Sequence, residues 1–270
     1  MLTTTEFKDK LVLEISKCEK VKGIGQTGDI NAKLIPGQSD IDLFILCSAI
    51  PSEKERLLIY SNLASNYSEC TMSVCNGGLW GYGDILVSNN IEVMPMYFTI
   101  EEMERYIVDT LNGKNINKAG RFYPTGRLAS VETINILYEE TSEWTKLKEK
   151  VQEYPKSLFK ALYSQNISCI LDEEDLGRVL LRKEILFYHQ VLEEALDHFL
   201  RALYAVNHSY FPSRKRIHLF IEYFQLKPQN CYTRLHQIII DSTNSETIEN
   251  SVRELKAIVA ELKELGRVYL

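Results

Sequence analysis

The sequence lacks the features of several large classes of protein. No apolar segment is long enough to span a membrane, which takes about 20 residues of helix. The six cysteines show no metal-ligand spacing such as Cys-x-x-Cys, so we expect reduced thiols in a cytoplasmic protein. The first residues have no basic stretch followed by an apolar run, and we therefore expect no signal peptide.

A surplus of positive charge is missing as well. The formal net charge is −6, which argues against general nucleic-acid binding and leaves room only for a local basic patch. Hydrophobic residues make up 45% of the chain and charged residues 25%, as in ordinary globular proteins. The 270 residues are enough for two modest domains or one large one.

The first part of the chain mixes the spacing of apolar residues typical of helices with that typical of strands. The pattern predicts helices over 6–19, over 54–66 and from a capping box at Thr99 and Glu102 to near Gly113, and strands over 21–24, 41–47, 71–74 and within a hairpin over 84–98.

From about Ser130 onward the pattern predicts almost only helices, the clearest over 174–206 and 246–265. The change near residues 120–130 is the predicted domain boundary. We therefore predict an α+β protein. Residues 1–125 would form a mixed β-sheet domain with flanking helices, and residues 126–270 an all-α helical bundle.

Asp40 and Asp42 stand at the start of a predicted apolar strand, within the segment Gly-Gln-Ser-Asp-Ile-Asp-Leu. Alternate side chains of a strand leave the same face, so the two carboxylates would lie side by side. Like charges held close repel each other. The pair is therefore expected either to be solvated or to hold a cation.

Two further features complete a set of residues suited to phosphoryl chemistry. The segment Lys-Gly-Ile-Gly-Gln-Thr-Gly-Asp, residues 22–29, is a glycine-rich turn whose backbone N–H groups can approach an anion closely. Glu92 lies on another predicted strand among apolar neighbours. Acids of this kind hold divalent cations, and such a turn holds a triphosphate. A plainer interpretation makes Asp40 a turn cap, Asp42 a solvated edge residue and the glycines parts of a tight loop.

The segments 23–28 and 37–43 resemble the signature of the nucleotidyltransferase fold, the DNA-polymerase-β-like superfamily. Its members include enzymes that adenylylate aminoglycosides and lincosamides, and the nucleotidyltransferase halves of some toxin–antitoxin pairs. The second half resembles the helical domain of a poorly characterised bacterial branch. The resembling stretches are Phe-Tyr-Pro-Thr-Gly (122–126), Ile-Leu-Tyr-Glu-Glu (136–140), Ala-Leu-Tyr-Ala-Val-Asn (202–207) and Tyr-Phe-Pro-Ser-Arg-Lys-Arg (210–216).

The resemblance implies a role for each matching position. Asp40 and Asp42 would ligate two Mg²⁺ ions, and a third acid would ligate one ion and help to deprotonate the acceptor hydroxyl. The turn would hold the β- and γ-phosphates of a nucleoside triphosphate, such as ATP. The residues assigned to that nucleotide site are Gly25, Gln26, Thr27, Gly28, Ser39 and, from the basic cluster 213–216, Lys215.

Two positions depart from the family pattern. The usual turn serine is replaced by Gln26 and Thr27, of which Thr27 offers a hydroxyl. The third acid is Glu92 in one strand register and is missing in the register shifted by two, which places Met94 there. Asp84 on the paired strand is a fallback.

The resulting prediction is a metal-dependent enzyme. It would transfer a nucleoside monophosphate from the triphosphate to a hydroxyl of a small molecule, possible acceptors including an antibiotic, and would release pyrophosphate. Two alternatives stay open: a non-catalytic nucleotide-binding or antitoxin-like module, and an enzyme that modifies a protein or a tRNA end. A membrane or general nucleic-acid partner is not expected, and the sequence does not define the oligomeric state.

Overall fold

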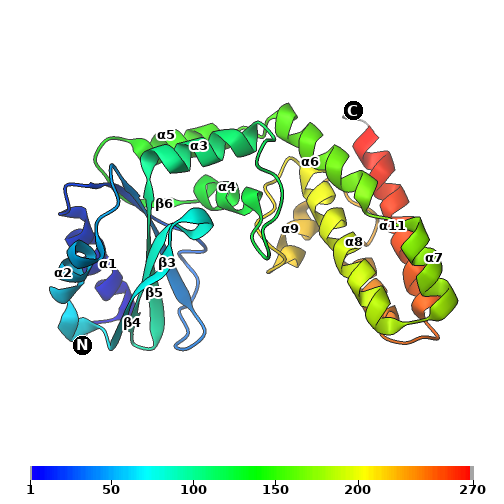
Figure 1. The fold of residues 1–270 in the computed structure, drawn as a ribbon, viewed down its shortest axis with the longest axis horizontal. Helices are drawn as coiled ribbons and strands as arrows, with labels where there is room; N and C mark the ends of the chain where they lie inside the picture. Colours follow the sequence, from blue (N-terminus) through cyan, green and yellow to red (C-terminus); the bar gives the residue numbers. More distant parts are fainter. Residues whose placement is uncertain (1, 268–270) are drawn as a thin grey trace. The chain divides into compact units, whose positions relative to one another are not determined.

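The computed structural model describes residues 2–267, which fall into two compact units (Figure 1). Within the described residues, the first unit comprises 2–108 with Ser130–Glu153, and the second comprises Asp109–Ala129 with 154–267. The chain thus passes between the units more than once, whereas the sequence analysis places a single boundary after residue 125. The segment 130–153 belongs to the first unit because it contributes an edge strand to its sheet.

The first unit is built on a mixed sheet of six strands in the described residues, in the order β3-β4-β5-β2-β1-β6. Strands β2 and β5 are parallel, and the other neighbours are antiparallel. The strands are β1 (Val21–Gln26), β2 (Asp40–Cys47), β3 (Glu69–Asn76), β4 (Tyr82–Ser88), β5 (Ile91–Thr99) and β6 (Asn135–Glu139). The helices of this part are α1 (Thr4–Ser16), α2 (Glu53–Ser61), α3 (Ile100–Leu111) and α5 (Glu143–Val151).

The predicted hairpin forms with its turn at Asn89 and Asn90. Both residues have positive φ angles, 52° and 59°, as a type I′ turn requires. Asparagine tolerates this left-handed conformation better than most residues. The turn therefore fixes how β4 pairs with β5, with Ser88 opposite Ile91 and Val87 opposite Glu92.

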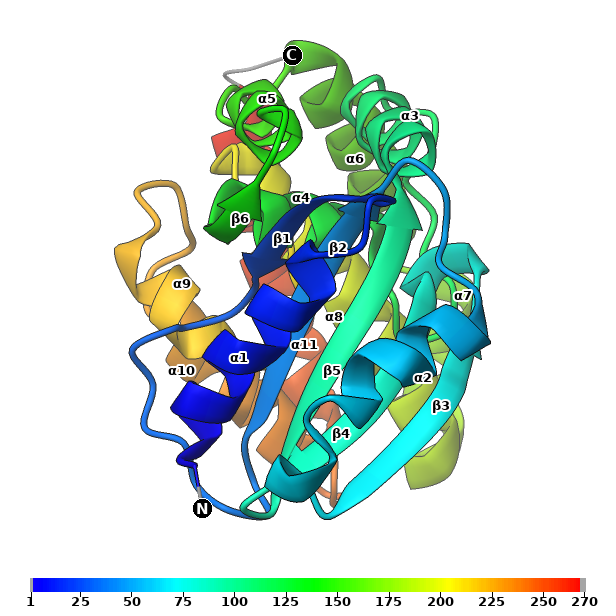
Figure 2. The same ribbon diagram turned by 90° about the vertical axis from the view of Figure 1, so that its left-hand side faces the viewer.

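One face of the sheet carries the core of the first unit. Figure 2 shows α1 and α2 lying across this face. In α1, Phe7, Leu11 and Ile15 recur every fourth residue and are fully buried. They pack in one cluster with strand residues such as Leu43 and Val93. Burial of this apolar stripe holds α1 on the sheet.

A buried ion pair fastens α2 to the same face. The Arg56 guanidinium donates to both carboxylate oxygens of Asp84, at 2.7 and 3.1 Å. The Tyr60 hydroxyl and the Ser73 backbone N–H donate to the same carboxylate, each at 2.8 Å. Arg56 is 2% exposed and Asp84 is fully buried, so all charge of the pair is satisfied inside the protein.

The second unit is helical and centres on the 22-residue helix α8, which is buried along most of its second half. α6 and α11 pack against α8. Helix α4 (Pro124–Glu132) begins in this unit and ends in the first. The other helices are α6 (Lys156–Cys169), α7 (Glu173–Arg182), α8 (Ile185–Val206), α9 (Ile217–Tyr223), α10 (Cys231–Asp241) and α11 (Ile248–Arg267).

The predicted α+β class is confirmed, and two details of the prediction are wrong. Residues 135–139 form strand β6 in a region predicted to be helical, because they pair with β1. The helix predicted over 174–206 is broken at Lys183, which adopts a left-handed conformation and caps α7 with its N–H on the Val179 carbonyl. Within residues 2–267, we find no helix with the length and apolarity needed to cross a bilayer.

We predict that Arg56→Met destabilises the protein by about 3–5 kcal/mol, because it leaves the Asp84 carboxylate buried without a cation. Urea unfolding followed by circular dichroism measures the change. The double variant Arg56→Met/Asp84→Leu removes both charges and should recover most of the loss. A double variant as unstable as the single one would show that packing, and not charge, holds this site.

Candidate functional site

Three carboxylates form a row across one end of the sheet. In register, Glu69 of β3 lies opposite Val87 of β4, Val87 opposite Glu92 of β5, and Glu92 opposite Asp40 of β2. Directly paired residues of neighbouring strands point to the same face. Asp40, Glu69 and Glu92 therefore share the sheet face opposite the one that α1 and α2 cover. We call these three residues the acidic row.

Asp42 lies one pleat further along β2 on the same face. The intervening residues Ile41 and Leu43 point into the core and are 3% and 0% exposed, whereas Asp40 is exposed and Asp42 half-buried. The alternation of the strand thus presents both aspartates to one side, as the sequence predicts.

A cavity of about 430 Å³ lies over the acidic row. Its lining contains no lysine or arginine. Glu69 was missed in the sequence analysis, because nothing local marks a glutamate at the start of β3 as part of a site formed by four strands. The lining residues are Gly37, Gln38, Ser39, Asp40, Glu69, Val87, Asn90 and Glu92.

The glycine-rich turn is fixed next to the aspartates by backbone pairing. Gln26 at the end of β1 lies opposite Leu43, and the Thr27 N–H donates to the Asp42 carbonyl at 3.1 Å. Gly28 follows with φ +81° and open space around its Cα, so the chain can turn there without a steric penalty. The structure therefore brings Thr27 and Gly28 beside Asp42.

Gly23 and Gly25 make room for neighbouring side chains and are not part of the turn. Both lie within β1, and a Cβ on Gly25 would stand 2.3 Å from Cδ1 of Ile134. A Cβ on Gly23 would stand 2.7 Å from the indole of Trp144, which also stacks on Phe44. These glycines make room for side chains that cover the sheet, so close packing explains them without a ligand.

The strand register shows where each candidate for the third acid lies. Glu92 lies beside Asp40, and Met94 lies beside Asp42. Asp84 is wrong as a fallback, because it points to the opposite face and is held by Arg56. Glu92 therefore stays the predicted third carboxylate.

The donor set fits a divalent cation in chemistry, since carboxylate oxygens are the ligands that Mg²⁺ prefers. Within the described part of the chain, however, no group of three or more Asp, Glu, His and Cys side chains is placed to hold a metal ion. Any ion here would depend on two protein carboxylates, with water and the substrate phosphates as further ligands.

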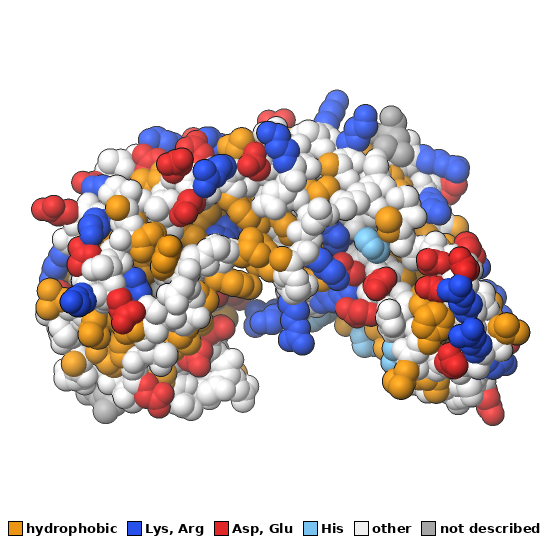
Figure 3. All heavy atoms as spheres, viewed as in Figure 1, with side chains coloured by type: hydrophobic (Ala, Val, Ile, Leu, Met, Phe, Trp, Pro, Cys, Tyr) orange, Lys and Arg blue, Asp and Glu red, His pale blue; other side chains and the backbone are white. Residues whose placement is uncertain are grey.

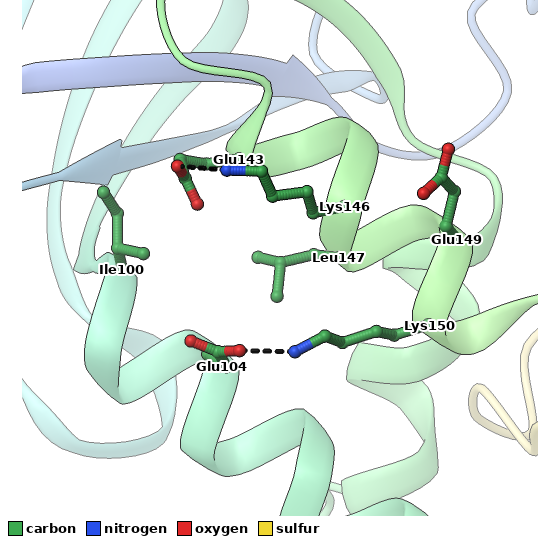
Figure 4. A pocket seen from close by; sticks show the side chains of 7 residues that line it. All are labelled: Ile100, Glu104, Glu143, Lys146, Leu147, Glu149 and Lys150. Atoms are coloured by element: carbon green, nitrogen blue, oxygen red, sulfur yellow. Dashed lines mark hydrogen bonds and ion pairs between the residues drawn. The ribbon is translucent and has the colours of Figure 1, made fainter.

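A second cavity, of about 420 Å³, lies between α3 and α5 of the first unit (Figure 4). Its charges pair with one another: Lys146 with Glu143 at 2.9 Å, and Lys150 with Glu104. Ile100, at its edge, follows the last residue of β5, whereas Glu92 is near the first. This cavity is therefore at the other end of β5 from the acidic row, and Glu149 is its one charged lining side chain without an ion pair among the described residues.

The basic cluster around Lys215 belongs to the second unit. Arg214 is used there: its guanidinium donates to the carboxylates of Glu193 on α8, at 2.6 Å, and of Asp197, at 3.1 Å. Asp197 is nearly fully buried and also accepts from Tyr123 and pairs with Lys118 at 3.1 Å. Arg214 thus anchors its loop, while Lys215 is exposed.

The pKa of Asp197 results from opposing effects. Burial alone would raise it, but hydrogen bonds from Tyr123, Lys118 and Arg214, together with the charge of Lys118, outweigh burial and hold the pKa below its ordinary value of 3.8. The carboxylate is therefore charged in the folded protein at neutral pH.

Comparisons with known proteins support the fold and leave the chemistry open. The model of a domain of unknown function, DUF4037, matches residues 122–216, and no curated protein matches the chain. The crystal structure of a nucleotidyltransferase-like protein from Exiguobacterium sibiricum 255-15 is similar, with a TM-score of 0.50 and 13% sequence identity. The match covers 99% of this chain and 78% of that one. The chain thus has a nucleotidyltransferase-like fold.

We predict that Gly25→Ala costs about 1–3 kcal/mol of unfolding free energy, because its methyl group overpacks against Ile134. Ile134→Val removes the crowding methyl group, so the double variant should be more stable than Gly25→Ala alone. Urea unfolding of the two single variants and the double variant measures the coupling. Additive losses would contradict a steric role for Gly25.

The lowered pKa of Asp197 predicts a pH-dependent contribution to stability. A carboxylate with a depressed folded pKa stabilises the protein above its unfolded pKa, and this contribution disappears as the pH falls through the folded value. Asp197→Asn should therefore be clearly less stable than the wild type at pH 7, and the difference should shrink below about pH 4. Urea midpoints between pH 3 and 7 test this. Glu246→Gln, at an exposed site, is the control and should change little at pH 7.

Proposed function

We propose that the protein is a metal-dependent nucleotidyltransferase that transfers a nucleoside monophosphate from a nucleoside triphosphate to a hydroxyl of a small molecule. One observation carries the proposal. The parallel register of β2 and β5 puts Glu92 beside Asp40, with Asp42 on the same face and the Thr27–Gly28 turn next to it. The nucleotidyltransferase-like fold supports the same conclusion.

The charges of the acidic row support a cation at this place. Asp40, Glu69 and Glu92 are exposed, and the lining of the cavity over them holds no lysine or arginine that would offset their charge. Two of the three carboxylates Asp40, Asp42 and Glu92 would hold each Mg²⁺, two ions in the full proposal, with water and the substrate phosphates as further ligands. When bound, the metal lowers the pKa of an attacking hydroxyl and neutralises phosphate charge.

The chain's own residues would divide the remaining work. The Gly28 N–H and the Thr27 hydroxyl would bind the β- and γ-phosphates, while the Thr27 N–H stays on the Asp42 carbonyl. Glu92 would accept the proton of the acceptor hydroxyl as its oxygen bonds to the α-phosphorus and pyrophosphate leaves. Gln26 and Ser39 are already used in part: Gln26 Oε1 accepts from Lys8 at 3.3 Å, and Ser39 Oγ from the Ile35 N–H at 2.8 Å.

A second candidate is a nucleotide-binding module without turnover. The observation that favours it is that Met94, and not a carboxylate, lies beside Asp42. The two candidates differ in Glu92: a catalytic base affects turnover, and a bystander affects neither turnover nor binding.

We predict that Glu92→Gln binds nucleotide within a few-fold of the wild type and loses pyrophosphate release by about 10²–10⁴-fold, as expected for a lost general base. Calorimetry with Mg²⁺ and each nucleoside triphosphate measures binding. Release of labelled pyrophosphate is assayed with a panel of aminoglycosides, lincosamides and sugars. Met94→Leu keeps the side-chain volume and is the matched control, with no expected effect on either readout.

Asp40→Asn/Asp42→Asn should abolish the Mg²⁺-dependent part of nucleotide binding, because the two amides cannot offset the charge of the cation. Nucleotide binding that is unchanged in this variant would disprove the metal site. Metal-dependent binding without turnover by the wild type on any acceptor, together with an unaffected Glu92→Gln, would favour the non-catalytic module.

A further inference from the structure

Helix α9 and the loop before it form an exposed basic and aromatic surface on the second unit. Figure 3 shows Lys and Arg side chains gathered near this helix. The surface consists of Lys215, Arg216, His218, Leu219, Tyr223, Tyr232 and His236, and we call it the α9 face.

The cations of the α9 face are not used inside the protein. Arg214 holds the loop on α8 through Glu193 and Asp197. Arg216 takes a left-handed conformation, with φ 56°, and starts α9. In contrast to Arg214, neither Lys215 nor Arg216 has an ion partner among the described residues. Arg214 thus anchors the loop, whereas Lys215 and Arg216 are exposed to solvent.

One side of α9 packs against the second unit, and the other side is exposed. Ile221 is 2% exposed, and the rings of Phe220 and Phe224 contact Tyr204 of α8 at centroid distances of 5.8 and 4.8 Å. Leu219 and Tyr223, spaced by four residues, are 48% and 78% exposed. An exposed tyrosine ring on a fixed helix costs free energy that a ligand could recover by covering it.

Further rings continue the face onto α10. The ring of His218 lies 5.7 Å from that of Tyr232, and Tyr232 lies 4.8 Å from His236. The His236 ring nitrogen and the Tyr232 hydroxyl are 3.1 Å apart, which holds these two side chains together. Three rings from two helices therefore lie in sequence, and the first of them, His218, is two residues from Arg216. The only acid of α9 is Glu222.

We propose that the α9 face binds single-stranded nucleic acid. Two free cations suit phosphates, and planar rings suit stacked bases, which is how such strands are held without sequence preference. An acidic peptide would also meet the cations, but the face offers it a single exposed aliphatic side chain, Leu219, against four rings. The net charge of −6 restricts binding to this local patch. This inference does not rest on the proposed nucleotidyl transfer.

The test uses the full chain and fluorescence polarisation with a labelled 12-nucleotide oligo(U) at 50 mM KCl. Lys215→Gln/Arg216→Gln should weaken binding at least tenfold and should reduce the slope of log K against log salt by about 1.4, since each phosphate contact on a single strand contributes about 0.7. Tyr223→Ala should weaken binding about tenfold with an unchanged salt slope, because it removes stacking and no charge.

Lys160→Gln/Lys263→Gln is the matched control. It removes the same charge from exposed lysines on α6 and α11 and should leave the affinity within twofold. Circular dichroism checks that every variant is folded. No binding of oligo(U) by the wild type, or an equal loss in the control variant, would overturn the proposal. Tighter binding of a poly-glutamate peptide than of oligo(U) would also overturn it, in favour of an acidic protein partner.

Discussion

The parallel pairing of β2 with β5 is the constraint on which the rest of the first unit depends. It runs without a bulge from Asp40 opposite Glu92 to Cys47 opposite Thr99. Because the side-chain period of a strand is two, a slip by one residue would turn Asp42 into the core and Leu43 out of it. Burial of the apolar face of each strand therefore also sets the positions of the carboxylates, and no further interaction is needed to align them.

Much of this arrangement could be predicted from the sequence, since the periodicity of β2, β5 and α1 follows from burial on one face. The strand β6 could not, because all five of its residues are half-buried and none marks a core. Nor could the break at Lys183, since lysine has no preference for a left-handed backbone. The Glu92 register depends on pairing between strands far apart in sequence, which local patterns leave undefined.

The glycine-rich segment 23–28 is a second case in which the sequence pattern does not define the role of its residues. A sequence cannot separate a glycine that admits a ligand from one that admits a neighbouring side chain, since both only require a missing Cβ. The structure separates them by position. Gly23 and Gly25 lie inside β1 under Trp144 and Ile134, while Gly28 stands beyond the strand end in open space. Only the last of these has no neighbouring side chain to explain the missing Cβ.

The carboxylates of this protein differ most in whether the folded chain places a cation beside them. Asp84 and Asp197 are buried, and each is paired with a cation, Arg56 for the first and Lys118 and Arg214 for the second. Burial without such partners would cost several kcal/mol, so these aspartates are parts of the framework. The acidic row is exposed and lies in a cavity without lysine or arginine. Folding thus offsets the charges of Asp84 and Asp197 inside the protein, whereas the carboxylates of the acidic row are left to solvent.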